Sequence, residues 1–289
     1  MESRRLKRSE VISRSDALPA FPAIVVRILA TIDDEEANMA LLVEHIRHDP
    51  VTAARILSTA NAAALGSQRQ GTVRDLFTAA SLIGTARVRE LALLGSVGNF
   101  FRRSSSGMPS TFWRHSIAVG MCAQELALLS GSRPGFGAVL IAGLLHDVGQ
   151  LWLQCFRADA FDAAVAGARE HCIPICEAER ECFGVDHAVI GGWLAEHWAL
   201  PENICRAIRF HHLPEEALGD ALVPVVHVAE VLANALDLSQ GSDNHVCSFS
   251  VPACDVLGLK WSADVQPLFG RMEARSRHAS KAFPRIGPR

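Results

Sequence analysis

Residues 138–149 read AVLIAGLLHDVG and decide the fold: an eight-residue apolar run ends in a His–Asp doublet, with a glycine two residues later. The run from Ala138 to Leu145 contains no polar residue and predicts a buried helix. His146 and Asp147 follow this buried segment directly, and a buried charge needs a partner or a metal. Imidazole and carboxylate together suit a divalent cation, so the doublet is a candidate pair of metal ligands.

The composition around this stretch is that of a globular protein with a large core. Of 289 residues, 49% are hydrophobic and 20% are charged, which excludes a disordered chain. The 21 glycines and 13 prolines are ordinary numbers, so collagen-like and low-complexity classes are excluded too. Tyrosine is absent, whereas there are 12 histidines, eight of them between His115 and His227. Such a concentration of imidazoles points to a site.

We predict a cytoplasmic protein without a membrane span. A span needs roughly 20 apolar residues, and the first 14 residues lack the apolar core of a secretory signal. The cysteines form no CxxC pair and are expected to be reduced thiols that mostly fill the core. Cys172 and Cys176 would lie one helical turn apart, so a zinc site at this pair stays open as an alternative.

The net charge of −3 hides an uneven distribution. Residues 1–14 carry five basic and two acidic residues, and residues 271–289 carry six and one. This leaves 17 of the 28 basic and 28 of the 31 acidic residues for the rest of the chain, a balance of −11. We expect the two basic ends to be solvated and frayed. A basic tail could also contact nucleic acid, but the acidic body argues against that partner.

Helical periodicity runs through almost the whole chain, and no stretch shows the alternation of a strand, so we predict an all-α protein. Asp49 with Pro50, Asp75 and Asp186 are predicted helix starts, and Gly84 is a predicted helix end. The predicted helices span approximately residues 24–32, 41–46, 50–66, 75–83, 85–101, 112–130, 136–156, 158–171, 187–198, 202–212 and 222–236.

A polar stretch at residues 103–110 (RSSSGMPS) is the best internal boundary. Together with the charge distribution it predicts four parts. These are a basic segment (1–15), an N-terminal helical lobe (16–108), a second helical lobe (109–238), and a loop with a basic tail (239–289).

The second lobe contains further candidate ligands. His115 lies early in a helix, His187 at a helix start, His211 and His212 at a helix end, and Glu230 in an apolar helix. Only the fold can bring such distant residues together, as helical bundles do in one- and two-metal sites. The remaining histidines are expected to have ordinary roles: His45, His48, His171, His197, His227, His245 and His278.

The order of these residues resembles the HD superfamily of metal-dependent phosphohydrolases, in particular its HD-GYP branch. Further motifs stand in both lobes. They are Leu18-Pro19-x-Phe21-Pro22, Ile46-x-x-Asp49-Pro50-x-x-x-Ala54-x-x-Leu57-x-x-Ala60-Asn61, Ala79-x-x-x-Ile83-Gly84, Arg87-Val88-Arg89, Phe112-Trp113-x-His115-Ser116, His146-Asp147-x-Gly149, Phe183-Gly184-Val185-Asp186-His187-x-x-x-Gly191, and His211-His212. With these motifs the chain resembles the HDOD domain, the HD-related output domain, over roughly residues 16–236.

The resemblance implies a two-lobed HDOD fold, with a helical N-terminal lobe packed on an HD-like helical lobe. It also implies a mono- or dinuclear centre of a divalent metal, in which Fe, Mn, Zn and Ni are not distinguishable. The implied ligands are His115, His146, Asp147, His187, His211, His212 and Glu230. Most proteins of this kind are thought to be non-enzymatic scaffolds or regulators in bacterial signalling.

The chain departs from the active HD-GYP pattern in three places. Gln150 replaces a lysine that would place a cation near the substrate phosphate. The GYP motif is absent, and the acids Glu215 and Glu216 that follow the His doublet would repel a phosphodiester. Glu230 replaces an aspartate and is one methylene longer.

These features predict a non-enzymatic signal-transduction adaptor with a retained metal site. Its partners would be signalling proteins such as a kinase, a response regulator or a cyclic-dinucleotide enzyme. The alternative is a metal-dependent phosphohydrolase acting on a nucleotide or cyclic dinucleotide, in which Asp147 and the histidines hold the metal and a metal-bound hydroxide attacks. Neither a GxSxG motif nor a P-loop supports another catalytic class.

Overall fold

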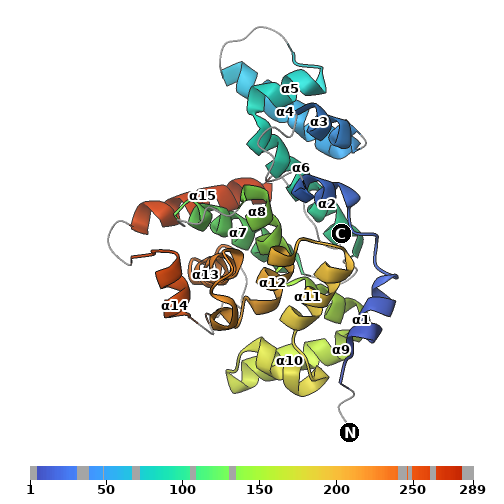
Figure 1. Cartoon of the computed structure of the whole chain (residues 1–289), viewed down its shortest axis with the longest axis vertical. Coiled ribbons are helices and arrows are strands. Elements are labelled where there is room, and N and C mark those ends of the chain that lie inside the picture. The colour runs from blue at the N-terminus through green and yellow to red at the C-terminus, as the bar shows by residue number, and fades with distance from the viewer. Residues whose placement is uncertain are drawn as a thin grey trace. The chain divides into compact units, whose positions relative to one another are not determined.

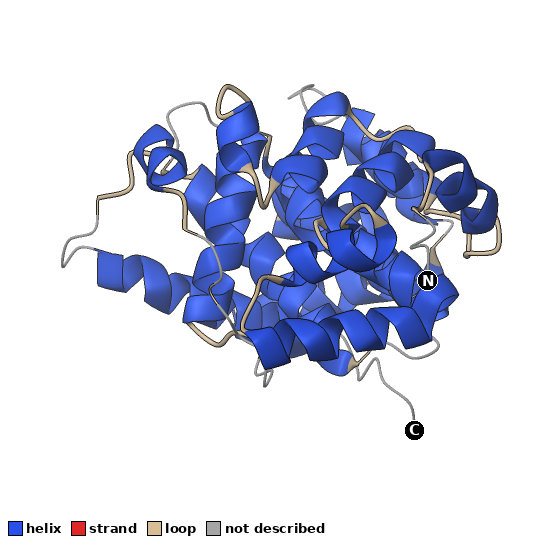
Figure 2. Cartoon of the chain, turned by 90° about the horizontal axis from the view of Figure 1, so that it is seen from below, coloured by secondary structure: helices blue, strands red, loops and turns tan. Residues whose placement is uncertain are grey.

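The computed structural model of the chain describes residues 5–30, 39–47, 49–66, 72–104, 109–129, 135–239, 246, 249–260 and 265–281. Every regular element in these ranges is a helix, which confirms the all-α prediction (Figures 1 and 2). The helices are α1 (Arg8–Ser15), α2 (Ala23–Ala30), α3 (Met39–Arg47), α4 (Pro50–Gly66), α5 (Leu76–Ile83), α6 (Thr85–Ser104), α7 (Ser110–Ala127), α8 (Phe136–Leu145), α9 (Val148–His171), α10 (Ile175–Phe183), α11 (His187–His197), α12 (Glu202–Phe210), the short 3-10 helix η1 (Pro214–Ala217), α13 (Leu222–Ala235), α14 (Val251–Val256) and α15 (Gln266–Lys281).

The chain divides into two compact units. The first consists of Met1–Ala20, Phe101–Pro134 and Ala138–Arg289, and the second of Phe21–Phe100 and Gly135–Gly137. All seven candidate ligands belong to the first unit. The four-part division of the sequence stays a prediction.

In the second unit, α3, α4 and α5 pack against one another, and their ends follow the predicted caps. A carboxylate oxygen of Asp75 accepts a hydrogen bond from the backbone N–H of Thr78 at 2.7 Å, and Asp49 accepts one from that of Thr52 at 3.3 Å. Gly84 ends α5 with a φ of 84°, a conformation that a side chain disfavours. These helix boundaries therefore follow from local sequence chemistry.

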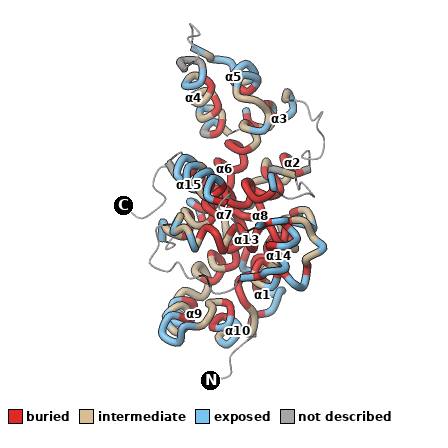
Figure 3. Tube along the Cα trace, turned by 90° about the vertical axis from the view of Figure 1, so that its left-hand side faces the viewer, coloured by how far each residue is buried: buried red, intermediate tan, exposed pale blue. Residues whose placement is uncertain are grey.

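In the first unit, α7 and α8 form much of the core (Figure 3). Residues 138–145 of α8 are buried on every face, as their apolar sequence predicts. Gly143 of α8 allows close packing on α7, because a Cβ there would lie 2.7 Å from the Cα of Gly120. Helices α13 and α15 also pack on α7, while α9 contacts both α10 and α11.

The predicted helix over 136–156 is interrupted at the His–Asp doublet. Helix α8 ends at Leu145 and α9 begins at Val148, so His146 and Asp147 lie in the turn between two helices. Helix α9 then has non-helical backbone angles at Arg157, at the predicted break between two helices. By length and composition the stretch Gly137–His171 could cross a membrane, but 78% of its most apolar window is buried in the protein.

The prediction of solvated, frayed ends is wrong for residues 8–15 and 266–281, which form α1 and α15. Val11 of α1 is fully buried, and its carbonyl oxygen accepts a hydrogen bond from Nε1 of Trp152 at 3.2 Å. At the other end, Arg271 and Arg275 donate to the carboxylate of Glu125 on α7 at 2.8 and 2.9 Å. Short helices and helices rich in charged residues are weak periodic signals, so α1, α10, α14 and α15 are absent from the predicted helices.

The described cysteines are free thiols, as predicted. Cys172 is exposed, and Arg180 donates a hydrogen bond to Cys176. Neither residue belongs to a cluster of metal-ligand type in the described part of the chain, so the zinc alternative gains no support. Cys247 lies outside the described residues.

Candidate metal centre

The fold brings all seven candidate ligands to one place in the first unit. They come from five separate positions along the chain. His115 lies in α7, His146 and Asp147 between α8 and α9, His187 at the first residue of α11, His211 and His212 after α12, and Glu230 in α13. The fold therefore brings these distant candidate ligands together, as a shared metal site needs.

The Asp147 carboxylate lies at the centre of the cluster. Its Oδ1 is 3.1 Å from Nε2 of His187 and 3.7 Å from Nε2 of His211. Its Oδ2 is 3.2 Å from Nε2 of His146 and 3.8 Å from Nε2 of His115. The two oxygens thus face two different pairs of imidazoles.

Potential ligand atoms fall into two groups, in each of which all atoms lie within 4.8 Å of one another. Asp147, His187, His211 and His212 form one group, and three further residues form the other: His115, His146 and Glu230. The Nε2 atoms of His187 and His212 are only 2.9 Å apart. Two imidazole nitrogens at this distance need either a shared proton or a shared cation.

The imidazole rings are oriented by hydrogen bonds at the nitrogen that faces away from Asp147. Nδ1 of His146 donates to the carbonyl of Gly143 at 2.9 Å, and Nδ1 of His211 donates to that of Ile208 at 2.7 Å. These bonds fix the tautomer and leave Nε2 as a free lone pair, as in metal-binding histidines. The Nε2 atoms of both rings, and Oδ1 of Asp147, are buried and make no hydrogen bond.

Glu179 of α10 completes the set around His187, and no motif in the sequence indicates it. Its Oε2 accepts hydrogen bonds from Nδ1 of His187 at 2.6 Å and from the backbone N–H of His187 at 2.8 Å. Glu179 is fully buried. Glu179 lies eight residues before His187, but this spacing indicates a contact only when α10 is known to be a helix.

Burial and neighbouring charges move the pKa values in opposite directions within the cluster. Burial disfavours the charged forms of His146 and His187, but Asp147 beside the first and Glu179 with Asp147 beside the second raise both pKa values. Burial and neighbouring imidazoles hold the pKa of His211 and of His212 well below the usual value.

The remaining three groups follow the same rules. Burial and the neighbouring His146 lower the pKa of His115 to about 4. Burial raises the pKa of Glu230 to about 7. Burial alone would raise the pKa of Asp147, but His146 and His187 hold it well below its usual range. Asp147 is therefore the permanent anion of the cluster.

His227 has a structural role, in agreement with the ordinary role predicted for it. Its Nδ1 donates to the carbonyl oxygen of His211 at 2.7 Å, and its Nε2 accepts from the backbone N–H of Ser250 at 3.1 Å. It joins neither ligand group. Nor do the other described histidines: His45, His171, His197 and His278. His48 and His245 lie outside the described residues.

The close packing of α9 on α11 explains why the HD-x-G motif has a glycine at position 149. A Cβ on Gly149 would overlap the carbonyl oxygen of His187, the first residue of α11. A side chain would therefore separate the start of α9 from the start of α11, and with them Asp147 from His187. The motif glycine sets the spacing of two candidate ligands.

Two of the residues that depart from the active HD-GYP pattern, Gln150 and Glu215, have defined surroundings in the structure. Gln150 is half-buried in the first turn of α9. Glu215 is hydrogen-bonded to the hydroxyl of Ser250, which also caps α14 by accepting from the N–H of Ala253 at 3.2 Å. The segment after the His doublet thus supports the start of α14 in this structure.

The residues present fit a divalent metal. Buried imidazole and carboxylate atoms without partners are costly unless a cation satisfies them, and nitrogen with oxygen is the donor set for borderline divalent ions. An all-helical unit with a central Asp flanked by His from several helices is the arrangement that the resemblance to HD proteins implied. The match of the HDOD domain family model to residues 18–214 shows that this chain belongs to the HDOD family.

Solved structures support the fold. An HDOD domain protein of unknown function from Geobacter sulfurreducens is 26% identical, with a TM-score of 0.77 over 94% of this chain and 96% of the other. A protein of Shewanella amazonensis SB2B, to which a phosphohydrolase function is ascribed, is 22% identical, with a TM-score of 0.70 over 95% and 98%. A protein of Marinobacter aquaeolei VT8, to which a signal-transduction role is ascribed, is 24% identical, with a TM-score of 0.72 over 98% and 62%.

An uncharacterized protein of Treponema pallidum (strain Nichols) is 25% identical over 233 residues. The match includes 79% of this chain but only 44% of that relative, so this chain spans less than half of the relative's length.

Proposed function

We propose that the protein is a metal-binding regulator of bacterial signal transduction whose metal centre is not a phosphodiesterase. The observation that carries the metal part is the set of buried Nε2 atoms around Asp147, each on a ring held by a hydrogen bond at Nδ1 or by Glu179. Residues of an abandoned site would not need such orientation. The family membership supports the signalling part.

Two cations fit the donor set better than one. Oδ1 and Oδ2 of Asp147 face the two ligand groups, so this carboxylate would contribute to both. His187, His211 and His212 would hold the first ion, and His115, His146 and Glu230 the second. A bound divalent metal would supply Lewis-acid polarisation and would hold five chain segments together.

Three features favour regulation over hydrolysis. Gln150 offers a neutral amide where a phosphate would require a cation. The carboxylate of Glu215 accepts a hydrogen bond from the hydroxyl of Ser250, in the segment that would carry the phosphate-binding motif. His146, His187 and His211 have fully buried side chains, and that of Asp147 is 7% exposed. The side chains of His115, His212 and Glu230 are the most exposed of the seven, at 14–17%.

The regulatory proposal is tested by a phosphodiesterase assay on metal-loaded protein. Anaerobically reconstituted protein with Fe²⁺ or Mn²⁺ is incubated with a cyclic dinucleotide and with bis(p-nitrophenyl) phosphate. We expect bound metal and no turnover. Turnover that disappears in His146→Ala and Asp147→Ala, but persists in His171→Ala, would establish the phosphohydrolase instead. We also propose that the protein acts through signalling partners, namely a kinase, a response regulator or a cyclic-dinucleotide enzyme.

A further inference from the structure

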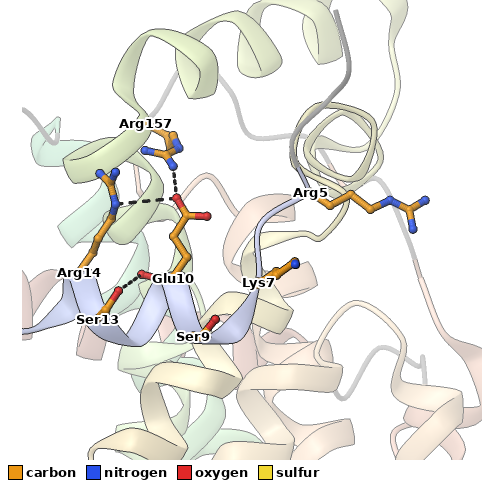
Figure 4. Close-up of a pocket in the computed structure, with 7 residues that line it drawn as sticks. All are labelled: Arg5, Lys7, Ser9, Glu10, Ser13, Arg14 and Arg157. Atoms are coloured by element: carbon orange, nitrogen blue, oxygen red, sulfur yellow. Dashed lines mark hydrogen bonds and ion pairs between the residues drawn. The ribbon is translucent and has the colours of Figure 1, made fainter.

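A second group of charged side chains lines a cavity of about 800 Å³ beside α1, separate from the seven candidate ligands (Figure 4). Four of its lining residues are cationic, two carry hydroxyls and one is acidic. They are Arg5, Lys7, Arg14, Arg157, Ser9, Ser13 and Glu10. The cavity therefore has a formal charge of +3, in a chain whose body is acidic.

The single acid leaves this positive charge largely uncompensated. Glu10 forms ion pairs with both Arg157 of α9 and Arg14 of α1, the latter at 3.8 Å (Figure 4). One carboxylate thus lies between two guanidinium groups. Neighbouring Arg8 does not line the cavity, and it pairs with Glu196 at 3.0 Å.

Arg5 and Lys7 form no ion pair with any residue in the described part of the chain, and both are exposed. Their backbone is nevertheless held in place. The N–H of Leu6 between them donates to the carbonyl of Phe183 at 2.8 Å, and Leu6 is only 5% exposed. The aliphatic part of Arg5 lies directly over Gly184, where a Cβ would come within 2.5 Å of its Cγ.

Helix α1 is also anchored to α9, which carries Arg157. Val11 is fully buried, and its carbonyl accepts from Trp152 of α9. The cations therefore project from two connected helices and one fixed extended segment. A ligand here would meet cations that are carried on an ordered backbone, which lowers part of the entropic cost of binding.

This combination selects phosphate among anions. Guanidinium groups bind phosphate oxygens through paired hydrogen bonds, and the hydroxyl of Ser9 and the ammonium of Lys7 add further donors. The hydroxyl of Ser13 already donates to the carbonyl oxygen of Glu10 at 3.1 Å. A single carboxylate would need only one arginine, whereas three uncompensated charges match a chain of phosphates. The volume lies in the range of small-molecule sites, roughly 300–1,000 Å³. We propose that this cavity binds a small molecule with a phosphate chain, either pyrophosphate itself or the phosphate end of a nucleotide.

The test is isothermal titration of the full chain with pyrophosphate, ATP and adenosine. We expect pyrophosphate and ATP to bind and adenosine not to bind. Equal affinity for pyrophosphate and ATP would identify the phosphates as the whole determinant, and tighter ATP binding would identify a nucleotide. Arg5→Gln with Lys7→Gln should weaken binding about tenfold or more. Lys260→Gln with Arg277→Gln removes two exposed cations elsewhere in the first unit and should leave affinity unchanged.

Repetition in the presence of a chelator separates this site from the candidate metal centre. Binding to the cavity needs no metal and should persist, whatever the metal centre holds. The proposal is overturned if neither phosphate compound binds at low salt, if both double variants behave alike, or if binding disappears with the metal. Melting temperatures of the two double variants verify that both are folded.

Discussion

His187 shows at the scale of one residue how the candidate centre is built. Its Nδ1 and its backbone N–H both donate to Glu179, while its Nε2 faces Asp147 and His212. The sequence indicated His187 as a candidate ligand, but it could not indicate the carboxylate that orients it. Such a partner is defined by its position in space, and the buried Glu179 has no motif of its own.

Glu179→Gln is predicted to weaken metal binding without removing a candidate ligand. The neutral amide orients His187 less strongly and makes its Nε2 a poorer donor, so affinity should fall about 10–100-fold. Competition with a chromophoric chelator measures the change. Glu177→Gln is the matched control, since Glu177 is exposed on the same helix. Equal affinities in the two variants would mean that Glu179 does not act on the metal.

Gly149→Ala is predicted to destabilise the protein, because the new Cβ would overlap the carbonyl of His187. Overpacking of this kind costs about 1–3 kcal/mol. Urea unfolding followed by circular dichroism measures it. Gly167→Ala in the same helix is the control, because no atom other than the adjoining backbone of its own helix lies within 4 Å of its Cβ position. That variant should be as stable as the parent or more so.

At the scale of elements, the helix ends follow from residues close in sequence, whereas α1 and α15 depend on contacts with distant parts of the chain. Asp75 and Asp186 cap α5 and α11 as predicted, since a cap depends on neighbours in sequence. Helices α1 and α15 were missed, because both are rich in charged residues whose contacts lie far away in the sequence. The sequence around Arg271 and Arg275 is typical of a solvated tail, because their partner Glu125 lies about 150 residues earlier in the chain.

The attachment of α15 to α7 is predicted to depend on pH. Burial would raise the pKa of Glu125, but hydrogen bonds from Arg271 and Arg275 lower it below the usual 4.5. A lowered folded-state pKa gives stability that is fully present above the unfolded-state value and is lost as the pH falls through the folded-state value.

Arg271→Gln with Arg275→Gln should therefore lower stability by about 1–2 kcal/mol at neutral pH. The deficit should shrink in acid, where Glu125 is protonated in both proteins. Thermal unfolding across a pH series provides the comparison, with exposed Arg277→Gln on the same helix as the control. A deficit that is constant at all pH values would show that the charges of these pairs do not stabilise α15.

At the scale of the whole molecule, five chain segments of the first unit meet at one cluster, so metal binding and stability should be linked. A ligand that binds only the folded state stabilises it by mass action. The sequence predicted the seven members of this cluster because six stand in family motifs and Glu230 follows them in an apolar helix, in the order that the family resemblance implies. It could not predict their geometry, which depends on close approaches such as that of Gly149 to His187.

Metal-dependent stabilisation is predicted to weaken in acid. His146 and His187 have raised pKa values, so protons compete with the metal for their Nε2 atoms as the pH falls. The rise in melting temperature on adding Mn²⁺ or Zn²⁺ should be larger at about pH 8 than at about pH 6. A metal effect that is independent of pH would place the ion on groups other than these imidazoles.

The most direct measurement is the metal content of anaerobically reconstituted protein after removal of free ions, determined by mass spectrometry of the elements. We expect the parent protein and His171→Ala to retain a divalent metal in the same stoichiometric amount. Asp147→Ala should lose it, because this carboxylate faces both ligand groups. A parent protein without metal above background, or an Asp147→Ala variant that keeps the full amount, would contradict the assignment of this cluster as a metal centre.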